Sequence, residues 1–147
     1  MPSVLDAAPA NPANYGYFDH AADIGVIGRG ASPEQALESA AAAAFAVMCE
    51  PAALQPSTRV DVEFDEDDTE FALVTWINRL LGEARQRGLV FGRFRLTRAQ
   101  AHWRGSAWGE PWNDALPRGV EVKGATLTAL SVCPSDGAWE ARCVIDV

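Results

Sequence analysis

The chain has 147 residues, 48% of them hydrophobic, with 20 acidic and 12 basic side chains and a formal net charge of −8 at pH 7. This length supports one hydrophobic core and is too short for two ordinary domains. The acidic balance argues against direct nucleic-acid binding, which needs clustered cations. No run of about 18 apolar residues is present, so we expect a cytoplasmic protein without a membrane partner.

The first 14 residues are rich in Ala, Pro and Asn and show no periodicity, so we expect residues 1–14 to be a flexible leader and residues 15–147 to be one domain. Asp19, His20 and Asp23 then place two carboxylates and an imidazole within five positions, just before a strand expected at Asp23–Arg29. Neighbouring carboxylates repel each other unless a cation or hydrogen-bond donors compensate them. This stretch is therefore either a solvated turn or a site.

Two helices are predicted. Ser32 and Gln35 have the spacing of a capping box around Pro33, which indicates a helix from there to about Cys49. Its apolar face is predicted to comprise Ala36, Leu37, Ala40, Ala41, Ala44, Phe45 and Met48. The run of five alanines makes this helix narrow, so it can lie close to a sheet.

The second helix is expected at Thr69–Arg87, with Gly88 ending it. Its inward face is predicted to comprise Phe71, Val74, Ile77, Leu81 and Ala84. The acidic run DEDD at 65–68 could bind a metal, but anions before a helix also cap its free amides and complement its dipole. We favour the capping interpretation.

The remaining segments have strand patterns. Val60, Val62 and Phe64 alternate with charged residues, which is the period of a half-buried strand. Further strands are expected at Leu89–Thr97, Ala99–Gly109, Val120–Cys133 and Trp139–Val147, with a turn at Pro134–Gly137 joining the last two. The order, about ββαβαββββ, predicts an α+β domain with two helices packed on a largely antiparallel sheet.

The cysteines and tryptophans favour structural roles. Cys49, Cys133 and Cys143 are widely spaced and form no Cys-x-x-Cys pair, so we expect buried free thiols. The stretch HWRGSAWGEPW at 102–112 could stack on nucleic-acid bases, but tryptophans in strands more often lie in a core or contact a partner. His102 has no second imidazole or carboxylate nearby in sequence and is expected to be an ordinary hydrogen-bonding histidine.

A local basic segment interrupts the acidic chain, because no acidic residue occurs between Glu83 and Glu110. Arg93 and Arg95 project on the same side of a predicted strand. This side is either a solvated face or a contact for an anionic partner.

The last two residues raise a second question about charge. Asp146 and the α-carboxylate of Val147 place two anions beside each other at the end of an apolar strand. Oxygen ligands of this kind suit a hard cation such as calcium or magnesium, although a frayed chain end would look the same. Because no phosphate-binding glycine loop, Gly-x-Ser-x-Gly elbow or His-Glu-x-x-His motif is present, the sequence is not typical of an enzyme.

Taken together, several segments resemble the archease family. They are FDHAADIGVIGRG at 18–30, SPEQALESAAAAAFAVM at 32–48, WINRLLGEARQRGLVFGRF at 76–94, AWGEPW at 107–112, GVEVKGATLTAL at 119–130 and WEARCVIDV at 139–147. The similarity covers nearly all of 15–147. It implies a non-enzymatic protein cofactor of the GTP-dependent tRNA-splicing ligase that joins RNA 3′-phosphate or cyclic-phosphate ends. Such a cofactor promotes guanylylation of the ligase and its multiple turnover in tRNA splicing or RNA repair.

The resemblance also implies a metal site for a divalent cation, calcium in vitro. Matching the family motifs residue by residue assigns the metal ligands to Asp23, Asp146 and Val147, with Asp19 and His20 in supporting positions. Two departures stand out: the family's Thr-Ala-Asp is Ala-Ala-Asp here, and its aromatic-His pair is replaced by Leu127 and Thr128.

Two other functions stay open at this point. The first is a chaperone-like modulator of a tRNA methyltransferase, a role that is also attached to the family. The second is a small metal-dependent hydrolase using Asp19, His20, Asp23 and Asp146. An activator shows no metal-dependent turnover of nucleotides or phosphoesters, whereas a hydrolase does.

Overall fold

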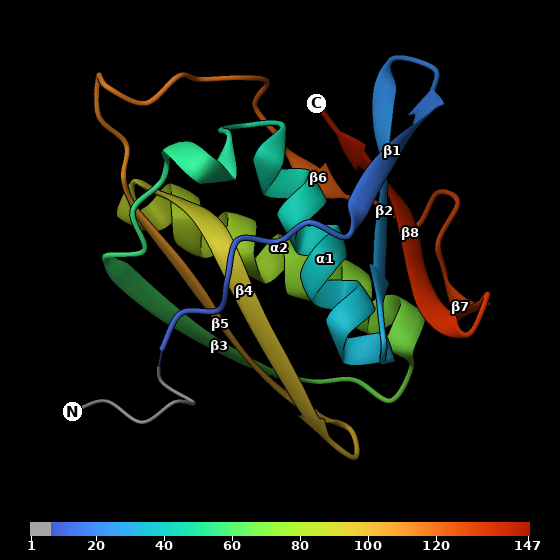
Figure 1. Ribbon diagram of the computed structural model, residues 1–147. Coiled ribbons are helices and arrows are strands. Elements are labelled where there is room, and N and C mark those ends of the chain that lie inside the picture. The colour runs from blue at the N-terminus through green and yellow to red at the C-terminus, as the bar shows by residue number, and fades with distance from the viewer. Residues whose placement is uncertain (1–6) are drawn as a thin grey trace.

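The computed structural model describes residues 7–147 and has an α+β architecture with two helices and two antiparallel sheets, which confirms the predicted fold class (Figure 1). Among these residues, no helix is both long and apolar enough to cross a lipid bilayer. The elements are β1 Tyr15–His20, β2 Asp23–Gly30, α1 Pro33–Ala46, the short 3-10 helix η2 Pro51–Ala53, β3 Thr58–Asp65, α2 Thr69–Arg87, β4 Leu89–Ala99, β5 His102–Pro111, β6 Gly124–Ala125, β7 Ser131–Ser135 and β8 Ala138–Asp146.

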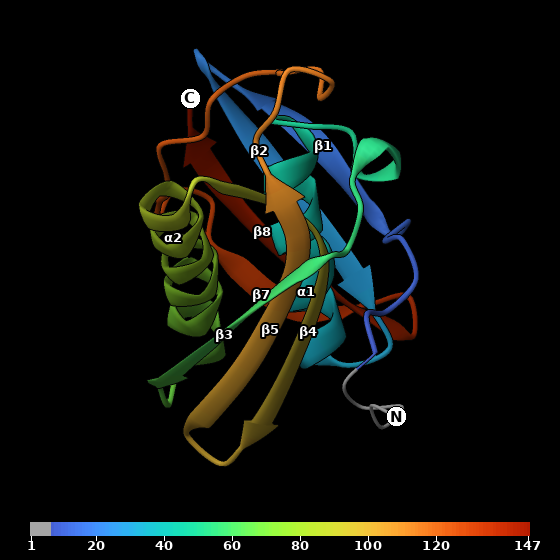
Figure 2. The ribbon, with the colours of Figure 1, turned by 90° about the vertical axis from the view of Figure 1, so that its left-hand side faces the viewer.

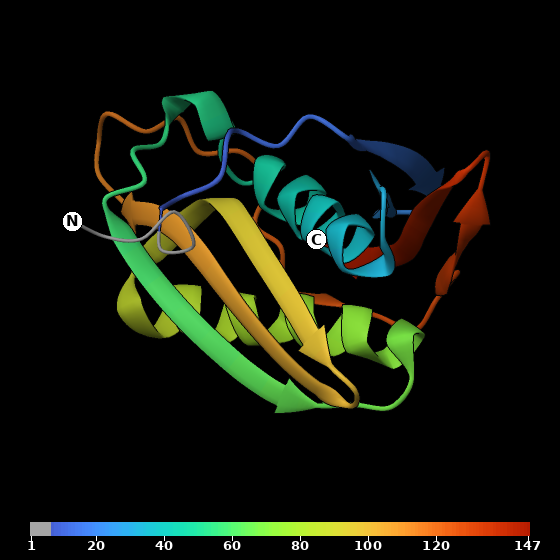
Figure 3. The ribbon, with the colours of Figure 1, turned by 60° about the horizontal axis from the view of Figure 1, so that its bottom comes forward.

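The strands divide between two sheets, which the sequence pattern does not reveal. The larger sheet has the order β1-β2-β8-β6, and β7 pairs with the same edge of β8 farther along the strand. The smaller sheet has the order β3-β5-β4. Figure 3 shows the smaller sheet on one side of the molecule and the larger sheet on the other, with both helices packed alongside.

Helix α1 lies between the two sheets and contacts β2, β4 and β8 (Figure 2). The close approach predicted from its alanines is confirmed, because a Cβ added to Gly28 of β2 would lie 2.2 Å from the backbone nitrogen of Ala40. Ser32 caps the helix by accepting a hydrogen bond from the Gln35 backbone, as predicted. The helix ends at Ala46 rather than near Cys49, so Met48 lies beyond it and is half-buried.

Helix α2 has the predicted bounds, because both of its caps are encoded locally. Asp68 accepts hydrogen bonds from the backbone nitrogens of Glu70 and Phe71, which confirms the capping interpretation of the acidic run, and Gly88 ends the helix in the left-handed conformation. The predicted inward orientation of Phe71 is wrong, since 47% of this residue is exposed. The buried face of α2 is turned toward Ala72, Leu73, Trp76, Ile77, Leu80, Leu81 and Ala84.

One predicted strand is absent. Instead of a continuous strand over Val120–Cys133, the chain forms the two-residue β6, a loop, and then β7. Asn78 of α2 replaces a strand neighbour here, because its side chain bonds both the backbone nitrogen and the carbonyl of Ala125. Ala129 then has a φ of 54°, which a strand does not tolerate. The turn before β8 is confirmed, with Asp136 and Gly137 at positive φ between paired strands.

The three thiols are free, as predicted, but they are not all buried. Cys49 and Cys143 lie in the core, whereas Cys133 is exposed on β7. Of the predicted leader, residues 1–6 lie outside the described residues. Residues 7–14 form no helix or strand, and the carbonyl of Pro9 accepts a hydrogen bond from Arg93 of β4.

Candidate functional site

The turn between β1 and β2 carries the acidic and histidine residues singled out from the sequence. His20 pairs with Asp23 across a two-residue turn formed by Ala21 and Ala22. Ala21 has a φ of 52°, a conformation that costs a residue with a Cβ about 1–2 kcal/mol. The tight turn fixes Asp23 at the start of β2, where its side chain is half-buried.

The strand register brings Asp23 and Asp146 together from opposite ends of the chain. Ile24 of β2 pairs with Ile145 of β8, so the next position along the antiparallel ladder places Asp23 opposite Asp146. Directly opposed residues share one face of a sheet and have Cβ atoms about 5 Å apart. Asp23 and Asp146 therefore lie at the same end of the sheet, and the register assigns them to the same face.

The same register separates the two supporting residues. His20 lies opposite Asp23 and so shares its face, forming a row with Asp23 and Asp146. Asp19 pairs with Ile24 and projects to the other face. The four residues considered for a hydrolase are thus not brought to one face.

Backbone contacts hold the end of β8 in place. The Asp23 carboxylate accepts a hydrogen bond from the backbone nitrogen of Val147 at 3.3 Å. On the other side of β8, the carbonyl of Asp146 accepts a hydrogen bond from the backbone nitrogen of Lys123 at 2.8 Å, and Asp146 pairs with Gly124. Asp146 is therefore carried by a strand with neighbours on both sides, while its side chain is exposed.

Beside this row, the outer face of the sheet carries a packed aromatic residue. Phe18 lies opposite Gly25, and a Cβ at Gly25 would lie 2.4 Å from three atoms of the Phe18 ring. The Arg142 guanidinium lies 5.6 Å from the ring centre. A hydrogen bond from Arg142, together with the charges of Arg142 and Arg29, lowers the pKa of Glu140. Sequence reasoning missed the packing of Phe18 on Gly25, although a glycine opposite an aromatic residue in a hairpin indicates such packing.

The side chains alone do not complete a metal site. In the described part of the chain, no group of three or more His, Cys, Asp or Glu side chains is arranged to hold a metal ion. Asp23 and Asp146 supply two carboxylates, so further ligands would have to come from the main chain, from water or from a partner. Calcium accepts such mixed oxygen ligands in irregular geometries.

Comparison with known proteins identifies the family. The model of the Archease protein family (MTH1598/TM1083) matches residues 15–147, which include every residue of the site described above. The chain belongs to the archease family. The protein archease of Sulfolobus acidocaldarius is 35% identical over 89% of this chain and 96% of its own length, and that of Pyrococcus furiosus is 32% identical over 89% and 96%.

Solved structures agree with this assignment. The solution structure of Methanobacterium thermoautotrophicum protein 1598 matches with a TM-score of 0.82 at 28% identity, covering 91% of this chain and 99% of that one. The crystal structure of a Thermotoga maritima archease, described as a possible chaperone, matches with a TM-score of 0.62 at 20% identity, covering 88% and 94%. The second likeness shows a shared fold.

Leu127 and Thr128, which were singled out from the sequence, lie near the candidate site. Leu127 is 61% exposed and Thr128 is also exposed, in the loop that follows β6. This loop is fixed to β8, since the backbone nitrogen of Thr126 bonds the carbonyl of Val144 and the Val144 nitrogen bonds the Thr128 carbonyl. Leu127 thus presents an exposed apolar side chain beside the end of β8.

The other candidates lie on the smaller sheet, away from this end of β8. Arg93 and Arg95 share the outer face of β4, as predicted, and Arg95 lies 5.9 Å from the ring centre of Trp108. Trp108 and Trp103 are buried, in agreement with a structural role. His102 bonds Asp65 at 2.8 Å, which confirms an ordinary hydrogen-bonding histidine.

Proposed function

We propose that this archease is a cytoplasmic, metal-binding activator of a GTP-dependent RNA ligase that joins 3′-phosphate or cyclic-phosphate ends in tRNA splicing or RNA repair. The observation that carries the proposal is the apposition of Asp23 and Asp146 at one outward-facing end of the larger sheet. The family resemblance supplies the partner, and the geometry supplies the site through which this chain would act.

Electrostatics support a cation between the two carboxylates. Like charges directly opposite each other on neighbouring strands are destabilising. Two unit charges about 5 Å apart repel by about 0.8 kcal/mol in water and by about 3 kcal/mol at an effective dielectric constant of 20. A divalent cation converts this repulsion into attraction, and the donors are all oxygens, which suit calcium or magnesium.

The chain's own residues hold the two carboxylates for this task. Asp23 is fixed by the β1–β2 turn and by its bond to the Val147 nitrogen. Asp146 is fixed by its pairing with Gly124 and by the Ile24–Ile145 pair next to it. Val147 itself is placed beside Asp23, so its carboxylate is the third oxygen donor in the proposal. A bound cation would supply positive charge at the surface, where oxygens of a partner can complete its coordination.

The proposed ligase contact therefore centres on this end of the sheet. His20 adjoins the carboxylates on the same face and supplies an imidazole at the rim. Leu127 adds an exposed apolar side chain in the neighbouring loop. Arg93 and Arg95 lie on the other sheet and are proposed as a second, separate partner contact, because cations there complement an anionic surface.

The test is a single-turnover assay of ligase–guanylate formation with GTP and divalent metal. This protein is added in a smaller molar amount than the ligase. We expect the wild type to accelerate guanylylation without being consumed, and Asp146→Asn to stay folded but lose the acceleration. Asp136→Asn is the matched control, because it removes the same charge from the exposed β7–β8 turn. Equal acceleration by all three proteins would refute the metal-centred proposal.

Two parallel assays separate the alternatives. Metal-dependent turnover of nucleotides or phosphoesters by the protein alone would indicate a hydrolase. Altered specificity or solubility of a tRNA methyltransferase, with no effect on the ligase, would indicate the chaperone-like role.

A further inference from the structure

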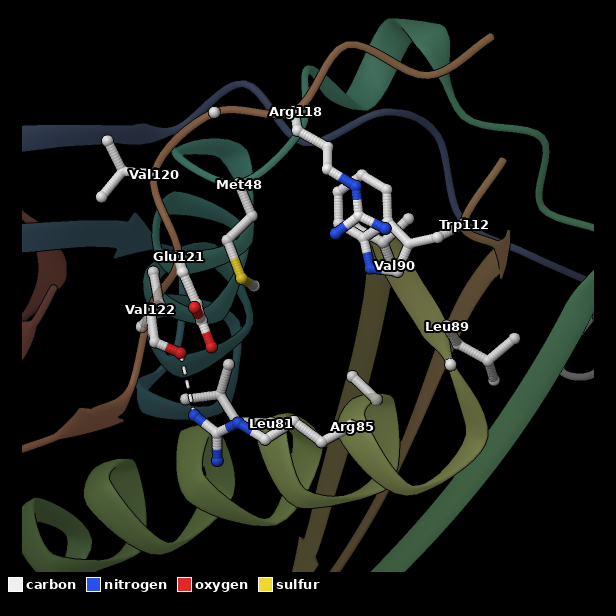
Figure 4. A pocket seen from close by; sticks show the side chains of 13 residues that line it. Met48, Leu81, Arg85, Leu89, Val90, Trp112, Arg118, Val120, Glu121 and Val122 are labelled. Atoms are coloured by element: carbon white, nitrogen blue, oxygen red, sulfur yellow. Dashed lines mark hydrogen bonds between the residues drawn. The ribbon is translucent and has the colours of Figure 1, made fainter. Parts of the chain in front are cut away.

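A cavity of about 380 Å³ lies between the C-terminal half of α2 and the segment 118–122 (Figure 4). Its walls are mostly apolar and include Met48, Leu81, Val90 and Trp112. Mostly apolar cavities of about 300–1,000 Å³ with a few placed polar groups are typical of small-molecule sites. The cavity lies apart from the Asp23 and Asp146 carboxylates, neither of which lines it.

Backbone hydrogen bonds preform this cavity. The nitrogens of Gly119 and Val120 donate to the carbonyls of Met48 and Val47, at 2.7 and 2.8 Å. The approach requires glycine at position 119, because a Cβ there would lie 2.2 Å from the Val47 carbonyl oxygen. On the opposite wall, the backbone nitrogen of Trp112 donates to the carbonyl of Gly88 at 3.1 Å. Ligand binding would therefore cost little free energy for ordering the cavity walls.

Two arginines line opposite ends of the cavity, as Figure 4 shows. Arg118 lies across the Trp112 ring, with its guanidinium carbon 4.0 Å from the ring centre. Arg85 is held by the carbonyls of Val122, at 2.8 Å, and Lys123. Both cations thus have defined positions, one of them over an aromatic ring and the other on the main chain.

Neither arginine is neutralised within the described residues. No carboxylate lies within ion-pair distance of Arg85 or Arg118 there, although Glu121 lines the same cavity. Two arginines of the smaller sheet differ, since Arg59 pairs with Asp61 at 2.9 Å and Arg104 lies 3.5 Å from Glu63. In a chain with 20 acidic side chains, two arginines left without carboxylates beside an apolar cavity indicate complementarity to an anion.

We propose that this cavity binds a small planar aromatic anion, an aromatic ring system that carries a carboxylate or a phosphate. The ring lies against Met48, Leu81 and Val90, beneath the Trp112–Arg118 stack. The anionic group is bound by Arg85, whose position the two carbonyls fix. Arg118, at the opposite end, adds its positive charge and its guanidinium stacked on Trp112 above the ring. The apolar walls supply affinity and the guanidinium groups select against neutral and cationic rings.

The test is a titration of the full chain with 2-naphthoate, followed by NMR through the indole N–H signal of Trp112. We expect a Kd of about 0.1–1 mM, as suits a ligand of this size. The neutral isostere 2-naphthamide should bind at least tenfold more weakly. A nucleoside monophosphate, tested in parallel, shows whether a phosphate can replace the carboxylate.

Variants locate the binding. Arg118→Gln should weaken 2-naphthoate at least fivefold, and Val120→Trp, at a 48% exposed position that lines the cavity, should block it. Arg79→Gln, an exposed arginine of α2 outside the cavity, is the matched control and should bind like the wild type. Equal binding of naphthoate and naphthamide would show an apolar docking groove and overturn the proposal, as would the absence of binding or shifts confined to other surfaces.

Discussion

Replacing Asp23 by Asn should reverse the order of stability between metal-free and calcium-loaded protein. Asn keeps an oxygen that can accept the 3.3 Å hydrogen bond from Val147, so the change removes charge with little loss of packing. In EDTA the variant should be more stable than the wild type by about 1 kcal/mol. This value is near the lower end of the calculated repulsion, because Asp146 is exposed and water screens the pair.

Calcium should change the sign of this difference. At a concentration 100 times its Kd, a ligand that binds only the folded state adds about 2.7 kcal/mol. The wild type should gain this amount and Asp23→Asn should gain almost none, so the wild type becomes more stable by about 1.5–2 kcal/mol. Urea denaturation with and without calcium measures both differences. The same calcium gain in both proteins, or none in either, would refute the reasoning, and Asp136→Asn controls for net charge.

Three further changes test separate parts of the structure. Ala21→Gly should stabilise the protein by up to about 1 kcal/mol in urea denaturation, since glycine relieves a positive φ but costs more chain entropy; destabilisation would contradict the turn geometry. Residues added after Val147 should weaken calcium binding in calorimetry, because an amide replaces the carboxylate, whereas an N-terminal tag should not. Burial raises the pKa of Glu38 above 4.5, although the hydrogen bond from the Leu96 nitrogen opposes this shift. The protonated Glu38 side chain therefore contributes stability at low pH, and this contribution is lost as pH rises through the folded pKa. Glu38→Gln should therefore gain stability relative to the wild type between pH 4 and 7, and a pH-independent difference would contradict this.

The elements predicted correctly are those with local signals. Asp68 and Gly88 mark both ends of α2, and the alternation around Val62 marks β3. The predicted continuous strand over Val120–Cys133 does not form, because residues distant in sequence determine what this segment bonds to. A side chain of α2 occupies one edge position, and the positive φ of Ala129 interrupts the extended backbone between β6 and β7. Phe71 was wrongly assigned to the buried face of α2, because the side of the helix that is buried depends on where the two sheets lie.

The candidate site has the same division between local and distant information. The acidic turn at His20 and Asp23 is visible in the sequence, but its position opposite Asp146 depends on the pairing of strands more than 100 residues apart. Only the family resemblance joined the two before the structure was known. The cavity lined by Arg85 and Arg118 gave no sequence signal, because its walls come from α2, β4 and an irregular segment.

A crystal structure of the calcium-soaked protein, with anomalous scattering used to locate the ion, tests most directly whether Asp23 and Asp146 form one cation site. The account predicts an ion with carboxylate oxygens of both residues at about 2.3–2.6 Å. An ion bound instead by the acidic residues at 65–68, or well-ordered Asp23 and Asp146 carboxylates with no ion between them at saturating calcium, would contradict it.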